Sequence, residues 1–152
     1  MILGIKDKEY YILFREYAPQ GMPWTWRLAL RFLIGKHREF AHVDIFRRVD
    51  ETQTLQIMSS PWQISVEIIE VPIELLMGSF REGGATACVR MMSRTEKDNY
   101  KWRGFIQCVS VAKAILGLRG TTKITPKNLY DLAIKNGGVV LWDKTIKIKE
   151  EK

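Results

Sequence analysis

Along most of the chain before residue 93, apolar and polar residues alternate or β-branched and aromatic residues cluster. Such patterns are typical of strands, because successive side chains of a strand point to opposite faces of a sheet. They predict strands over residues 9–17, 24–34, 39–49, 55–58, 62–71 and 85–92. Before the last of these, residues 72–76 form either a turn or a short helix, and the glycine-rich segment 78–84 is predicted to be a loop.

The spacing of apolar residues becomes helical from Cys108 onward. A helix over residues 108–118 is predicted by the apolar stripe Val109, Ala112, Ile115 and Leu116. A second helix is predicted to begin at Thr125-Pro126, because Thr is a favourable N-cap and Pro suits the first helical position. It is predicted to end at Asn136, before two glycines. Strands followed by two helices predict an α+β domain, with helices packed on one side of an antiparallel sheet.

The length of 152 residues fits one domain over residues 1–152, in which residues 143–152 are an edge strand at best and frayed at the end. A net charge of +7 favours a weak, nonspecific attraction to polyanions. The N-terminus lacks the pattern of a signal peptide, and no apolar stretch reaches the about eighteen residues that a membrane span needs. We therefore expect a soluble protein with no membrane span.

The motifs that mark nucleotide-binding sites and zinc proteases do not occur in the sequence. Its two cysteines, Cys88 and Cys108, do not have the spacing of a zinc site or of a disulfide framework. We therefore expect neither a metal nor a cofactor. Cys88 lies in a predicted strand between Ala87 and Val89, which indicates a buried structural thiol.

Cys108 and His42 are the candidates for chemistry. A cysteine in the first turn of a helix is favoured as a thiolate nucleophile, because the helix N-terminus stabilises an anion; alternatively, Cys108 simply packs at the edge of the apolar stripe. His42 shares a strand face with Asp44 and is either a half-buried histidine bonded to the backbone or a general base. His37, in a loop context, is expected at the surface. A thiolate, a histidine and a third polar group that orients the ring are the groups of nucleophilic acyl transfer.

Several short motifs carry a resemblance to a known family. They are Trp26-Arg27-Leu28-Ala29-Leu30-Arg31-Phe32, Ala41-His42-Val43, a hairpin with a strand that begins at Trp62, Gln107-Cys108-Val109, Leu116-Gly117-Leu118, and Thr125-Pro126 before Leu129-Tyr130. In these motifs the chain resembles the circularly permuted NlpC-type papain-like cysteine hydrolases, particularly the small versions carried by tailed phages. The resemblance covers roughly residues 24–138.

The resemblance implies a papain-like fold with Cys108 as the nucleophile and His42 as the base. The third residue, expected on the strand after the histidine, would be Gln56, with Ser59 and Asp44 as alternatives. Family members more often carry His, Asn, Asp or Glu there, and an amide orients an imidazolium without stabilising its charge. The implied reaction is the hydrolysis of an amide or acyl bond in a peptide or acyl substrate, such as a peptidoglycan peptide, without a cofactor.

A second interpretation follows from the departure at Gln56. The chain would then be a catalytically weak or inactive virion protein of the same fold, a structural or adaptor subunit whose basic surface meets DNA or other virion subunits. Under both interpretations the resemblance implies a bacteriophage protein, cytoplasmic or virion-associated. Tyr100 either packs its ring at the surface or, if the enzyme is active, is a candidate hydroxyl on the oxyanion or substrate side.

Overall fold

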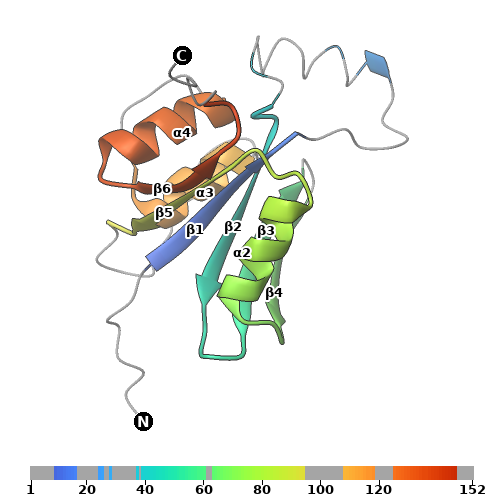
Figure 1. Ribbon diagram of the computed structural model, residues 1–152. Coiled ribbons are helices and arrows are strands. Elements are labelled where there is room, and N and C mark those ends of the chain that lie inside the picture. Colours follow the sequence, from blue (N-terminus) through green and yellow to red (C-terminus); the bar gives the residue numbers. More distant parts are fainter. Residues whose placement is uncertain are drawn as a thin grey trace, which may run out of the picture.

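The computed structural model describes residues 9–16, 24–25, 28, 37, 39–60, 63–94, 108–118 and 125–146. The described chain folds around a six-stranded sheet with the strand order β4-β3-β2-β1-β5-β6 (Figure 1), and each neighbouring pair is antiparallel. The strands are β1 (Glu9–Arg15), β2 (His42–Arg48), β3 (Thr54–Ser60), β4 (Gln63–Ile69), β5 (Ala87–Met92) and β6 (Val139–Asp143). The helices are α2 (Ile73–Glu82), α3 (Cys108–Leu116) and α4 (Pro126–Lys135).

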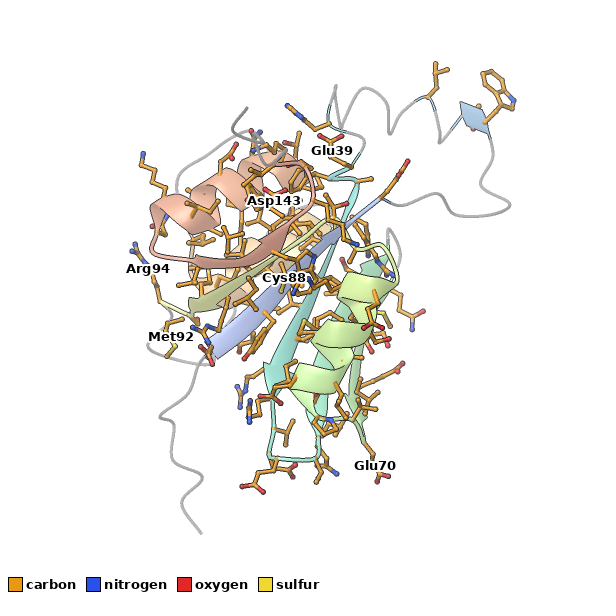
Figure 2. All side chains as sticks on the ribbon, viewed as in Figure 1. Glu39, Glu70, Cys88, Met92, Arg94 and Asp143 are labelled. Carbon is orange, nitrogen blue, oxygen red and sulfur yellow. The ribbon has the colours of Figure 1, made fainter. Side chains whose placement is uncertain are left out.

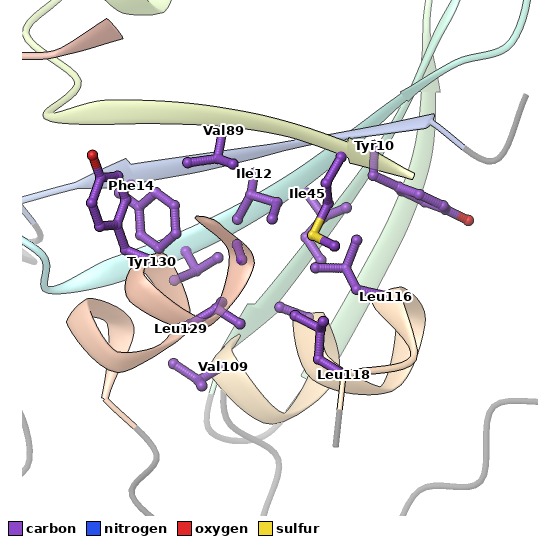
Figure 3. Packing of buried hydrophobic residues seen from close by; sticks show 14 of the residues in the cluster. Tyr10, Ile12, Phe14, Ile45, Val89, Val109, Leu116, Leu118, Leu129 and Tyr130 are labelled. Carbon is purple, nitrogen blue, oxygen red and sulfur yellow. The ribbon is translucent and has the colours of Figure 1, made fainter. Parts of the chain in front are cut away.

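Helices cover both faces of the sheet. The larger core lies between the sheet and the pair α3 and α4; Figure 3 shows much of it, including Ile12, Phe14, Ile45, Val89, Val109, Leu116 and Leu129. We call this side of the sheet the α3 face. The smaller core contains Leu13, Phe46, Ile73, Met77 and Cys88 and lies under α2, which crosses in front of the sheet in Figure 1. We call this side the α2 face.

Local sequence signals explain the bounds of α4. The Thr125 side chain accepts a hydrogen bond from the backbone N–H of Asn128 at 3.2 Å, and Pro126 occupies the first turn. At the other end, Gly137 adopts a positive φ of 91°, a conformation that costs glycine little and other residues more. The helix predicted from Thr125-Pro126 to Asn136 is therefore confirmed.

The sequence correctly predicted the α+β class and the antiparallel sheet, and the two helices after Cys108 do share one face. The glycine-rich loop predicted over residues 78–84 is wrong at its start, because α2 runs from Ile73 to Glu82 through Gly78. Ile73 and Met77, one helical turn apart, bury their side chains on the α2 face and stabilise this helix. A helix therefore covers the face of the sheet that the sequence left open.

Two further predictions are corrected or lie partly outside the described residues. Trp24, Thr25 and Leu28 are helical, so the strand predicted over residues 24–34 is wrong at these positions, and its other residues are not described. The last strand, β6, precedes the tail in which an edge strand was predicted, and residues 147–152 are not described. None of the described helices has the length and apolar character needed to cross a membrane.

Candidate active site

His42 lies at the end of the sheet, where β1 and β2 pair. It is the first residue of β2, and the antiparallel register places it opposite Arg15, the last residue of β1. Asp44 follows two residues later and therefore points to the same side of the strand. The His42 Nε2 atom lies 2.9 Å from Oδ1 of Asp44, within hydrogen-bond distance. The side chain of His42 is 13% exposed and that of Asp44 1%.

The second oxygen of the Asp44 carboxylate also has a partner. Nη2 of Arg15 lies 2.6 Å from Oδ2 of Asp44 in an ion pair whose geometry is not that of a hydrogen bond, whereas Oδ1 is within hydrogen-bond distance of His42. The Arg15 side chain is 35% exposed, whereas the carboxylate is buried. Asp44 is thus a buried anion between two neighbours, and such a group is stable only when it is paired.

Cys108 approaches the same imidazole from α3. It is the first described residue of that helix, is half-buried, and packs at the margin of the core on the α3 face. Asp44 points to the other face of the sheet, but His42 stands at the end of β2. Its ring forms side-chain hydrogen bonds with both Asp44 and Cys108, and both of these bonds affect its protonation.

The surroundings of His42 set its charge. Burial of the ring acts to lower its pKa, but hydrogen bonds with Asp44 and Cys108, together with the electrostatic effect of both side chains, outweigh it. The balance raises the pKa of His42 from 6.5 to about 9. At neutral pH the ring is therefore an imidazolium, able to give a proton to a departing group, and it lies beside a thiol.

The structure separates the three alternatives for the third residue. Gln56 pairs with Phe46, four residues along β2 from His42, which at about 3.3 Å per residue puts it about 13 Å away along the strand. Ser59 lies two residues after Ile57, which packs against the core on the α3 face. Because strand side chains alternate, Ser59 points to that same face, whereas Asp44 points to the α2 face. Asp44 contacts the imidazole, and it replaces Gln56 as the candidate orienting residue because the strand alternation keeps it beside His42.

The other histidine and the other cysteine of the chain are placed differently. His37 has a side chain that is 53% exposed and lies 3.4 Å from Glu39, on the surface as the sequence predicted. Cys88 is fully buried near the centre of the molecule (Figure 2), and its Sγ lies 3.8 Å from Sδ of Met77. Burial raises the pKa of the Cys88 thiol to about 12, so it is protonated at neutral pH. Both residues are natural controls for the candidate pair.

Sequence reasoning missed one residue of this site, Arg15. It lies within the strand predicted over residues 9–17, but only the register between β1 and β2 brings it beside His42 and Asp44. Tyr100 and the rest of the segment before Cys108, residues 95–107, lie outside the described residues. Within the described ranges, no three His, Cys, Asp or Glu side chains gather into a group able to bind a metal ion.

Comparisons of the chain with protein-family models, with curated proteins and with solved structures find no match.

Proposed function

We propose that this chain is a cysteine hydrolase of amide or acyl bonds, built on the plan of the circularly permuted NlpC-type enzymes. Cys108 is the nucleophile, His42 the general acid and base, and Asp44 the residue that orients the imidazole. One observation carries the proposal: a single partly buried imidazole contacts a carboxylate and interacts with a half-buried thiol. The order of these residues, with the histidine strand ahead of the cysteine helix, supports the permuted plan.

In the first half-reaction, the Cys108 thiolate attacks the carbonyl carbon of the substrate. A C–S bond forms and the carbonyl π electrons move onto oxygen. When the tetrahedral intermediate collapses, the bond to the leaving amine or alcohol breaks, and His42 gives its proton to that group. The products are a thioester on Cys108, a neutral imidazole and the free leaving group.

In the second half-reaction, neutral His42 takes a proton from water while the water oxygen attacks the thioester carbon. The C–S bond then breaks, which releases the carboxylic acid and restores the thiolate beside the imidazolium. Asp44 contacts Nε2, so Nδ1 is the nitrogen left to exchange protons with sulfur, water and the leaving group. A carboxylate at Nε2 both fixes the ring and stabilises its positive charge.

The substrate proposed is a peptide or acyl compound, such as a peptidoglycan stem peptide. The net charge of +7 supports an anionic substrate, because opposite charges raise the rate of encounter. The second interpretation, an inactive virion subunit, is not favoured by any contact at His42. Asp44, one of the alternatives to Gln56, has its carboxylate within hydrogen-bond distance of the His42 ring, which supports an active site.

Alkylation by iodoacetamide at neutral pH tests the proposal, with peptide mass analysis to follow both thiols in one sample. We expect Cys108 to react at least about tenfold faster than Cys88, because a thiol beside an imidazolium reacts as a thiolate and a buried thiol does not. His42→Ala should slow Cys108 alone, and His37→Ala, which removes the exposed histidine, should leave both rates unchanged. Equal slow labelling of both cysteines, or equal effects of the two histidine variants, would contradict the proposal.

A further inference from the structure

Arg15 holds the start of β2 through both its backbone and its side chain. Its carbonyl oxygen accepts a hydrogen bond from the N–H of Ala41 at 3.1 Å, and it is the cross-strand partner of His42. Its guanidinium lies 2.6 Å from Oδ2 of Asp44, on the carboxylate oxygen that His42 does not contact. Arg15 therefore belongs to the same group of contacts as His42, to which it is linked through Asp44.

A carboxylate held by one contact is free to turn about its last side-chain torsion, which has a broad energy minimum. Two contacts, one on each oxygen, fix the plane of the group. The guanidinium acts on Oδ2 through its charge at close range, since neither Oδ2 of Asp44 nor Nε of Arg15 makes a hydrogen bond. Since Asp44 is 1% exposed, water does not compete strongly for either oxygen.

We propose that Arg15 is a positioning residue, which fixes the Asp44 carboxylate so that Oδ1 faces Nε2 of His42 and the imidazole is held toward Cys108. The catalytic importance of this arrangement rests on the proposed hydrolase function. The positioning itself does not, because the geometry of the Arg15, Asp44 and His42 side chains can be measured without any substrate.

The charged and titratable groups that face His42 come from three described elements: Asp44 on β2, Arg15 on β1 and Cys108 on α3. Two effects of removing Arg15 therefore have opposite signs. The loss of its positive charge alone would raise the pKa of His42. The loss of carboxylate orientation would weaken the hydrogen bond that favours the imidazolium, and so lower this pKa. The direction of the change separates positioning from simple charge.

A double-mutant cycle with Arg15→Met and Asp44→Asn, read by NMR titration of the His42 ring, tests the proposal. In the natural background, Arg15→Met should lower the pKa of His42 by about one pH unit, a tenfold change in its protonation equilibrium. In the Asp44→Asn background it should not lower this pKa, because positioning acts through Asp44 and only the direct effect of the lost positive charge, which raises the pKa, remains. Arg90→Met is the matched control, since it removes the guanidinium that lies 3.1 Å from Glu9, an exposed ion pair elsewhere on the sheet.

An unchanged or raised pKa of His42 in Arg15→Met would overturn the proposal, as would an equal fall in the Asp44→Asn background. If Arg15→Met does not fold, Arg15→Lys replaces it, because the ammonium keeps a positive charge near Asp44 but carries it on a flexible stem. Its expected result is a smaller fall, and no fall would count against positioning. If Cys108 proves unreactive while the pKa of His42 still falls, the hydrolase function fails and the positioning role stands.

Discussion

Asp44→Asn is the perturbation that isolates the carboxylate's effect on His42. The amide has nearly the same shape, but it carries no negative charge. The pKa of His42 is raised from 6.5 to about 9. At about 1.4 kcal/mol per pH unit, the difference corresponds to about 3 kcal/mol in favour of the imidazolium. Burial opposes this shift; the hydrogen bond with Asp44 is the strongest of the effects that raise the pKa, followed by the hydrogen bond with Cys108 and the electrostatic attraction of both side chains.

The expected size of the change follows from the contact that is lost. A hydrogen bond to a charged group contributes about 1.5–3 kcal/mol, which is about one to two pH units. The pKa of His42 should therefore fall to between about 7 and 8 in Asp44→Asn, as the opposing effect of burial is less fully offset. In the natural protein the imidazolium persists as the pH rises toward 9, whereas in the variant it is lost near neutrality.

NMR titration of the ring C–H signals gives this pKa directly. The chain contains only two histidines, so His37→Ala assigns the signals without further labelling. The reasoning is refuted if the pKa of His42 stays near 9 in Asp44→Asn, or if it lies at or below 6.5 in the natural protein. The first result would mean that Asp44 does not hold the ring, and the second that burial dominates.

Two predictions concern the stability of α4 and of its contact with the sheet, and both are measured by urea unfolding. Thr125→Ala should lower the free energy of unfolding by about 1 kcal/mol, because it removes the acceptor for the N–H of Asn128; an unchanged midpoint would mean that this cap contributes nothing. Gly138→Ala should cost about 1–3 kcal/mol, because a Cβ there would lie 2.8 Å from the carbonyl oxygen of Ala133 and 2.7 Å from Val89 Cγ1. Gly78→Ala is its control, since the space around that helical glycine is open and the change should be neutral or stabilising.

Much of the fold was predictable because its signals are local. Alternation identified the central strands, and the Thr125-Pro126 start and the glycines after Asn136 bounded α4. The segment around Gly78 was wrongly predicted to be a loop, because glycine in a sequence usually indicates a loop. The sequence does not reveal that Ile73 and Met77 are buried against the sheet and stabilise a helix there. Tertiary packing outweighs the low helix propensity of one glycine.

The site was predictable in part, for a related reason. Residue chemistry and the family resemblance singled out Cys108 and His42. Strand alternation placed Asp44 on the same face as His42 and so made it an alternative third residue. Gln56 was preferred because the resemblance placed the third residue on the following strand, and only the register shows that this residue faces Phe46. Arg15 was missed because no local pattern encodes which residue of β1 lies opposite His42.

Formation of an acyl-enzyme on Cys108 is the most direct test of the central claim. The protein would be incubated with p-nitrophenyl acetate, quenched in acid, and examined by intact and peptide mass measurement. We predict the added mass of one acetyl group on Cys108, slower acetylation in His42→Ala, and none at this position in Cys108→Ala. Acetylation of lysines alone, or a Cys108 acetylation rate that does not depend on His42, would contradict the account.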